Sequence, residues 1–230
     1  LRGLHILYGM PMRLVVMTRN GGYARACNAG AEVARSHLLA MLNSDVIPHT
    51  PGWAQGLASK MGGPQEVAAV GPKLLFEDGS IQHAGMYFAP NESGKWLNYH
   101  YHKGMPDQYR DANVERSVPG VTGACMMLHR DAFNEVGGFT EDYVIGDYED
   151  SDLCLKIRQA DFDIKYIPDV SLYHFERKSI STHADYMRGV AAEYNAWLHA
   201  SRWRDILEDI HANGVPQERS LSKTKHGAAA

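Results

Sequence analysis

The chain has 230 residues, of which 44% are hydrophobic and 22% charged, and this is the composition of an ordinary globular protein. Its formal net charge is −4 at pH 7 with both signs intermixed, which argues against a nucleic-acid partner. No apolar run approaches the roughly 18 residues that a transmembrane helix needs, and no signal peptide is recognisable at the first residues.

The amino-terminal part alternates strand-like with helix-like segments. Short apolar or β-branched runs predict strands at 13–18, 38–42 and 67–71. Helical spacing of small and apolar residues predicts helices over 24–37 and 53–61. The run 38–42 has the pattern of a strand buried on both faces, and Pro48 is expected to prevent its continuation. This alternation predicts an α/β fold with a mostly parallel sheet flanked by helices.

The second half of the chain has a different pattern. The Asp78-Gly79 turn within 73–88 predicts a hairpin, and the polar, aromatic residues 89–117 are expected to form a long loop. Further strands are predicted at 123–128, 164–167 and 171–175, with a helix over 130–136. Apolar residues at helical spacing from His183 to Ile210 predict an amphipathic helix. We therefore expect an α/β domain over 1–182 and a helical extension with a polar tail over 183–230.

Four carboxylates crowd the segment before the apolar helical run that begins at Leu153. Helix dipoles and free N–H groups favour one or two acids there as caps, so the surplus suggests a carboxylate kept ionised for chemistry. Asp150 and Asp152 stand two residues apart and point in different directions on a helix, so both cannot serve one reacting atom. One of them is expected to be a cap or an anchor and the other a base, and Glu149 competes for the base role.

Two residues far apart in the chain are candidate metal ligands. Asp45 follows a buried strand, where open α/β sheets bind ligands, although Asn-Ser-Asp is also ordinary turn sequence. His174 lies among aromatic and apolar residues, where a histidine is more often part of the core. Together with diphosphate oxygens the two would make a mixed N/O site for Mn²⁺ or Mg²⁺. His100 and His102 are a separate candidate metal pair, but their spacing places no third ligand beside them. The role of His83 stays open.

Several motifs occur in an order that is typical of one enzyme family. They lie at residues 20–30, 42–48, 71–85, 122–125, 137–139 and 149–155. In this order they resemble the inverting, family-2 glycosyltransferases of the GT-A fold, the type that builds bacterial O-antigens and related polysaccharides. The resemblance extends from about residue 14 to residue 179 and implies transfer of a sugar from a nucleotide-diphosphate donor to a hydroxyl of a glycan or lipid-linked acceptor.

The resemblance implies a role for the acidic segment. Asp150 would be the general base that takes the proton of the attacking acceptor hydroxyl. The residues expected around the sugar and acceptor pocket are Thr122, Gly123, Glu149 and Asp152. Asp152 is also compatible with an anchor of the loop.

The donor side follows from the same resemblance. Asp45 and His174 would bind a divalent cation, Mn²⁺ or Mg²⁺, that bridges the two phosphates of the donor. The residues expected to contact the donor nucleotide are Arg25, Asn28 and Asn43. Asn43 stands where the family commonly has the first Asp of its D-x-D motif, which leaves one carboxylate fewer for the metal.

The resemblance also contains a departure. The family begins with two strands that hold the nucleobase, and neither precedes Arg13, so the chain is expected to be a fragment or a segment of a longer polypeptide. The alternative function is therefore a non-catalytic, truncated domain that binds a glycan or a partner protein. A sugar nucleotidyltransferase is a weaker alternative, because no Gly-rich phosphate loop follows the first strand.

The cysteines bear on the compartment. Cys27, Cys125 and Cys154 are odd in number and widely spaced, and they fit no zinc or disulfide pattern. This favours a reducing compartment, and we expect the cytoplasm. The predicted helix over 183–210 has enough apolar surface for a partner or for peripheral contact with the inner face of the plasma membrane.

Overall fold

A computed structural model describes residue 9 and residues 11–62, 66–175 and 189–216. Its main sheet contains the strands β1 (Leu38–Leu42), β2 (Val46–Pro48), β3 (Val67–Leu75), β4 (Ile81–His83), β7 (Arg116–Ser117), β8 (Cys125–His129) and β9 (Asp163–His174). A separate hairpin is formed by β5 (Met86–Pro90) and β6 (Trp96–His100). The helices are α2 (Gly22–Val33), α3 (Trp53–Ala58), α4 (Arg130–Glu135), α5 (Glu149–Gln159), α7 (Val190–Asn213) and the 3₁₀ helix η1 (Arg110–Ala112).

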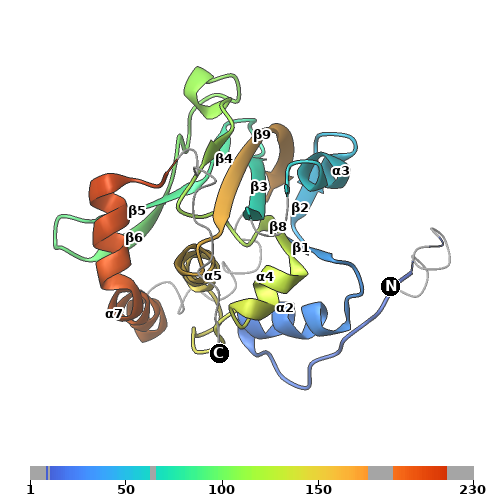
Figure 1. Cartoon of the computed structure of the whole chain (residues 1–230), viewed down its shortest axis with the longest axis horizontal. Coiled ribbons are helices and arrows are strands. Elements are labelled where there is room, and N and C mark those ends of the chain that lie inside the picture. The colour runs from blue at the N-terminus through green and yellow to red at the C-terminus, as the bar shows by residue number, and fades with distance from the viewer. Residues whose placement is uncertain (1–8, 10, 63–65, 176–188, 217–230) are drawn as a thin grey trace, which may run out of the picture.

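The predicted α/β class with helices flanking a central sheet is confirmed (Figure 1). The strand order is β1-β8-β3-β9-β2, with β4 paired to β3 and β7 paired to β9. The expectation of a mostly parallel sheet is wrong, because β3–β9 is the one parallel pair among the described strands. β1, β3 and β9 do run in one direction, as the strand–helix alternation predicts, but β8 is inserted between β1 and β3 and is antiparallel to both.

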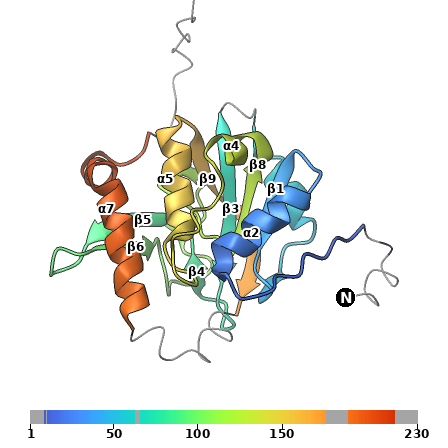
Figure 2. The same ribbon diagram turned by 90° about the horizontal axis from the view of Figure 1, so that it is seen from below.

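Each face of the sheet has its own core. Successive side chains of a strand point to opposite faces, and in β8 Met126 packs into the cluster with α2, α4 and α5, whereas Met127 packs into the cluster with α3. Figure 2 shows α2, α4 and α5 together on one side of the sheet. In the edge strand β1, buried and exposed residues alternate, because Leu39 and Met41 are buried whereas Ala40 and Leu42 are exposed. It is therefore not the fully buried strand that its apolar run predicted.

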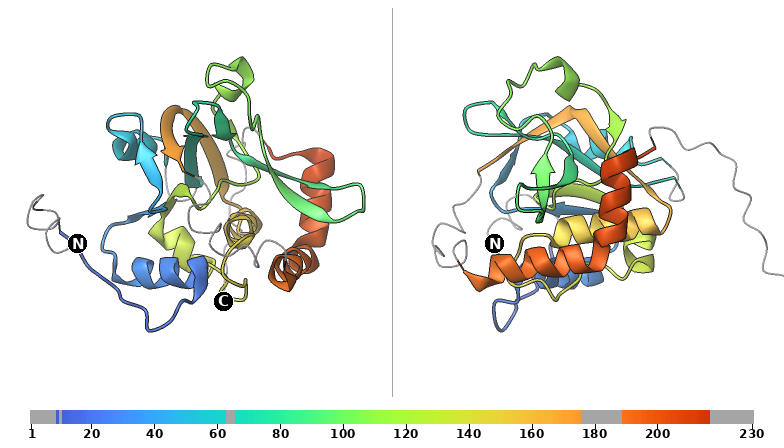
Figure 3. Two further views of the ribbon diagram at one scale, coloured as in Figure 1. Left: turned by 180° about the vertical axis from the view of Figure 1, so that it is seen from behind. Right: turned by 90° about the vertical axis from the view of Figure 1, so that its left-hand side faces the viewer.

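The helix α7 shares a third cluster with the hairpin and α5. Its members are Phe88, Trp96, Leu155, Trp203, Leu207 and Ile210. Figure 3 shows α7 running beside α5 with the hairpin against it. No helix in the described part is long and apolar enough to cross a membrane. The first residues of the predicted helix, 183–188, lie outside the described residues.

Three local expectations differ from the structure. Residues 13–18 are exposed and form no strand, because they pair with no described strand; Val16 is 78% exposed. The supposed loop 89–117 contains β6, which pairs with β5 around an Asn91–Gly94 turn. The strands predicted separately at 164–167 and 171–175 form the single strand β9, which continues through Pro168 at a point where its register against β3 shifts after Pro72.

Candidate functional site

Asp150 lies in the first turn of α5, half-buried. Its Oδ2 accepts a hydrogen bond from the backbone N–H of Gly123 at 2.9 Å, and its Oδ1 accepts one from the N–H of Ser151 at 2.8 Å. Hydrogen bonds from N–H groups and the dipole of the helix both stabilise a carboxylate at this place. The helix has the matching charge order, with three acids in its first turn and Lys156 and Arg158 in its last.

The end of β1 meets the same segment before β8. The N–H of Asn43 donates to the carbonyl of Ala124 at 2.9 Å, directly beside the Gly123 that binds Asp150. Two residues further, the carboxylate of Asp45 lies 3.4 Å from Nε2 of His174. The structure therefore brings Asn43, Asp45, Thr122, Gly123, Asp150 and His174 to neighbouring positions at one end of the sheet.

Gln82, which sequence reasoning missed, fixes the orientation of the His174 ring. The Gln82 amide donates from Nε2 to the carbonyl of His174 at 3.1 Å, so its Oε1 is the atom that faces Nδ1 of the ring at 2.7 Å. Nδ1 must then carry a proton, which in the neutral ring leaves the lone pair on Nε2, directed at Asp45. Histidine ligands of metals are commonly held in this way through the second ring nitrogen.

This pair of donors fits a divalent cation. Two ligands at right angles on a metal with bonds of about 2.1 Å are roughly 3 Å apart, close to the separation between Asp45 Oδ1 and His174 Nε2. Among the described residues no group of three or more His, Cys, Asp or Glu side chains could hold a metal. The described residues therefore offer two candidate ligands, an oxygen and a nitrogen, to which the substrate and water could add others.

His83 joins this region to the hairpin. Its Nε2 accepts the N–H of Thr122 at 3.4 Å, and its Nδ1 lies 3.1 Å from Nδ1 of His100. Burial, and then the neighbouring His100 and Arg116, hold the pKa of His83 well below its usual value, so the ring is neutral. A neutral ring can accept a hydrogen bond from the Thr122 N–H, so His83 helps to hold the segment that binds Asp150.

Tyr23 is a second residue that sequence reasoning missed, although it stands in the quoted motif 20–30. Its hydroxyl donates to the carbonyl of Gly123 at 2.5 Å, and its backbone N–H donates to the carbonyl of Ile145 at 2.8 Å. Burial raises the pKa of Tyr23 well above its usual value, so the hydroxyl stays protonated. The preceding Gly22 has φ +84°, and a Cβ there would lie 2.6 Å from the Ile145 oxygen, which explains the glycine. The signal in the sequence was an aromatic residue directly after a Gly-Gly turn.

Glu149 is almost fully buried beside Asp150. It is 7% exposed, and its Oε2 has no hydrogen-bond partner among the described residues. Burial, followed by the charge of Asp150, raises the pKa of Glu149 well above its usual value. Glu149 is thus biased towards its neutral form, whereas Asp150 is the carboxylate that receives the N–H groups.

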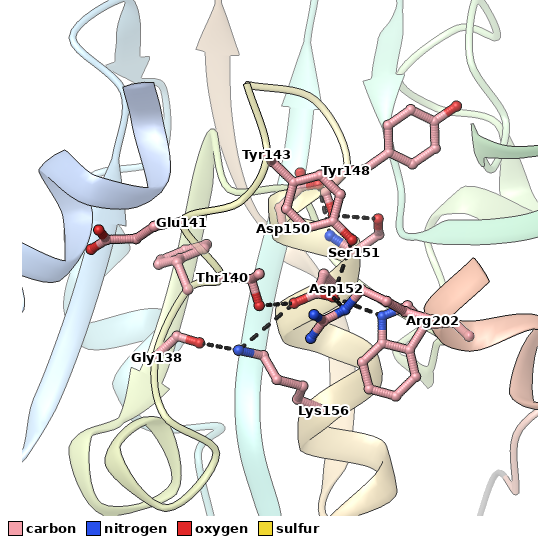
Figure 4. Close-up of polar contacts among 12 residues, drawn as sticks. Gly138, Thr140, Glu141, Tyr143, Tyr148, Asp150, Ser151, Asp152, Lys156 and Arg202 are labelled. Carbon is pink, nitrogen blue, oxygen red and sulfur yellow. Dashed lines mark hydrogen bonds and ion pairs between the residues drawn. The ribbon is translucent and has the colours of Figure 1, made fainter. Parts of the chain in front are cut away.

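Asp152, which was predicted to border the acceptor pocket, is enclosed within the protein. It is 0% exposed, and Figure 4 shows it enclosed by partners. These are Thr140 Oγ1 at 2.6 Å, Tyr143 OH at 3.1 Å, Arg202 Nε at 3.0 Å, Trp203 Nε1 at 2.7 Å and Lys156 Nζ at 3.7 Å. Such a carboxylate cannot reach an acceptor, and the anchor role is the correct one, because Asp152 ties α5 to α7.

Arg25 and Asn28, the predicted nucleotide contacts, both face residue Glu141. Arg25 Nε lies 3.6 Å from the Glu141 carboxylate, and Asn28 donates to that carboxylate at 2.9 Å. Asn28 also exchanges hydrogen bonds with the backbone of Phe139 at 3.0 and 2.9 Å. Asn28 therefore holds the 139–141 segment against α2, and nucleotide contact by either residue stays a prediction.

The fold and this arrangement define an α/β domain with a candidate active site at one end of its sheet. The sequence profile described as glycosyl transferase family 2 matches residues 3–137, and the chain belongs to this family. A second profile, described as the N-terminal domain of galactosyltransferase, matches residues 103–178. The O-antigen biosynthesis protein RfbC of Myxococcus xanthus is 31% identical over 81% of this chain. The chain spans 15% of the length of that relative.

Two solved glycosyltransferases show the same fold. GalNAc-T7, solved with UDP, GalNAc and Mn²⁺, matches 88% of this chain and 40% of its own length with a TM-score of 0.61 and 16% identity. The mannosyltransferase PcManGT from Pyrobaculum calidifontis, in complex with GDP-Man and Mn²⁺, matches 93% of this chain and 55% of its own length with a TM-score of 0.58 and 16% identity. The resemblance to the GT-A fold is thereby confirmed.

Proposed function

We propose that this chain is a metal-dependent, inverting glycosyltransferase domain that uses Asp150 as its general base. The observation that carries the proposal is the arrangement around residues 122–124. Asp150 binds Gly123, Asn43 binds Ala124, and two residues beyond Asn43 the carboxylate of Asp45 faces His174. The candidate base and the candidate pair of metal ligands, which are far apart in the sequence, are thus connected through the backbone of residues 123–124 and 43–45.

The reaction needs only one displacement. The Asp150 carboxylate accepts the proton of an acceptor hydroxyl while that oxygen bonds to the anomeric carbon of the donor sugar. The bond from this carbon to the diphosphate oxygen breaks, and the nucleoside diphosphate leaves with the electron pair. Attack from the face opposite the leaving group inverts the configuration at the anomeric carbon. Burial raises the pKa of Glu149 and so favours its protonated form, which cannot accept the proton.

Charge on the departing diphosphate would be neutralised by a divalent cation, Mn²⁺ or Mg²⁺, held by Asp45 and His174. Both solved relatives carry Mn²⁺ with a nucleotide or nucleotide sugar, which supports a cation here. The O-antigen relative supports a glycan or lipid-linked acceptor. Val190 and Trp197 of α7 are exposed apolar side chains, and peripheral contact of this helix with a membrane stays a prediction.

The test is sugar transfer by the purified chain, supplied with Mn²⁺ and nucleotide sugars. Asp150→Asn should lower turnover by about 10²- to 10⁴-fold, the usual contribution of a general base. Asp161→Asn, on the exposed turn after the same helix, is the matched control and should keep turnover within about twofold. Near-normal turnover of Asp150→Asn would refute the base role, and retention of the anomeric configuration would refute the single displacement.

A further inference from the structure

The helix α7 buries polar side chains along one stripe. Asn195 and His199 are 0% and 1% exposed, and Trp203 is 6% exposed. These residues recur every four positions, so they lie on one face of the helix. Buried polar groups need hydrogen-bond partners, and the partners described for this stripe lie in the segment 144–152.

Asn195 binds the backbone on both sides of Ile145. Its Oδ1 accepts the N–H of Val144 at 2.9 Å, and its Nδ2 donates to the carbonyls of Val144 at 3.1 Å and Gly146 at 2.6 Å. The carbonyl of Ile145, which lies between these two, accepts a hydrogen bond from the N–H of Tyr23 in α2 at 2.8 Å. The segment 144–146 is thus held between α2 and α7.

The held segment and the two residues after it include backbone conformations that are unfavourable for residues other than glycine. Ile145, Asp147 and Tyr148 have φ of 64°, 72° and 73°. A β-branched residue at positive φ is an outlier, and such conformations persist only where their surroundings hold them. Tyr148 is the N-cap of α5, so this conformation sets where the helix starts and where Asp150 points.

We propose that Asn195 is a positioning residue for Asp150. By holding residues 144–146 it fixes the start of α5 and directs the Asp150 carboxylate to Gly123 and the acceptor proton. The proposal rests on the proposed function, because it takes Asp150 to be the base. It also makes the carboxy-terminal helix, expected from the sequence to be an extension, a part of the catalytic unit.

The experiment compares three variants for turnover, for the KM of the donor and for amide hydrogen exchange. Asn195→Ala removes every side-chain bond to the segment. Asn195→Asp keeps the shape and the acceptor for the Val144 N–H, but it has no NH₂ group, so even when protonated it can donate to only one of the two carbonyls. Asn213→Ala is the matched control, because Asn213 lies at the exposed end of the same helix and binds only Asp209 among the described contacts.

Asn195→Ala and Asn195→Asp should each lower kcat by about 10- to 100-fold, the effect of a displaced catalytic group, while the donor KM changes less than about twofold. The Val144 amide should exchange at least about tenfold faster in Asn195→Ala and stay protected in Asn195→Asp. Asn213→Ala should change neither quantity.

Several results would overturn the inference. These are wild-type kcat in Asn195→Asp, unchanged exchange at Val144 in Asn195→Ala, or an equal loss of kcat in the control. The isosteric Asn195→Asp keeps the test decisive if Asn195→Ala does not fold. Full turnover of Asp150→Asn would instead sink the proposed function, and the exchange data would then still decide whether Asn195 holds the segment.

Discussion

The carboxylate of Asp150 is fixed to the backbone of Gly123, whose N–H lies 2.9 Å from Oδ2 although the two residues are 27 positions apart. Gly123 is in turn held through its carbonyl by the hydroxyl of Tyr23, 100 positions away. The candidate base is thus positioned by α2, by the segment before β8 and by its own helix.

Tyr23→Phe removes the hydroxyl that donates to the carbonyl of Gly123 and leaves that buried oxygen with one donor fewer. We expect a loss of about 1–3 kcal/mol in the free energy of unfolding, measured by urea titration. Tyr109→Phe is the control, because its hydroxyl makes a longer bond of 3.3 Å to the exposed Asp111. Its effect should stay within about 0.5 kcal/mol, and an equal effect of both variants would contradict the proposed support of Gly123.

Gln82→Ala removes the acceptor that orients the His174 ring. Loss of such a partner typically weakens metal binding by about 10- to 100-fold, and we expect this for Mn²⁺ in calorimetry. Gln55→Ala, at an exposed position of α3, should leave the affinity unchanged. Asp45→Ala should weaken binding further, and unchanged Mn²⁺ affinity in Asp45→Ala would remove the proposed metal site.

Asp152→Ala deletes a fully buried carboxylate and leaves Arg202 and Lys156 without their shared partner. Breaking a buried ion pair in this way costs about 3–5 kcal/mol, which urea unfolding should report. Asp205→Ala, on the exposed face of α7, is the matched control and should cost less than about 0.5 kcal/mol. A small effect of Asp152→Ala would mean that Asp152 does not anchor α7 to α5.

Glu149→Gln tests the raised pKa of Glu149. The unfolded chain loses this proton near pH 4.5, whereas the folded protein keeps it to higher pH. The contribution of Glu149 to stability is therefore complete below the unfolded pKa and is lost as the pH rises through the folded pKa. We expect the free energy of unfolding of the wild type to fall relative to Glu149→Gln as the pH rises above the unfolded pKa of about 4.5. Parallel stability curves for the two proteins would show that Glu149 titrates normally.

Much of the secondary structure followed from local pattern. Helical spacing gave α2 and α5, the Asp78-Gly79 turn gave the β3–β4 hairpin, and the crowded acids marked the start of α5. The strand predicted at 13–18 is absent, because an apolar, β-branched run forms a strand only when another strand lies beside it. The hairpin β5–β6 was missed because its aromatic residues obscured the alternation within a polar stretch.

The sequence by itself determined which residues are apolar or acidic, how often they recur, and the ordered motifs that point to a family-2 glycosyltransferase. Only the tertiary structure decided that β8 runs antiparallel between β1 and β3, that Asp152 is an anchor, and that Tyr23, Gln82 and Asn195 support the candidate site. The physical reason is the sequence separation of the residues that interact. Periodicity reports only which face of an element is buried, whereas these strand pairings and hydrogen bonds join residues that are distant in sequence and meet only after the chain has folded.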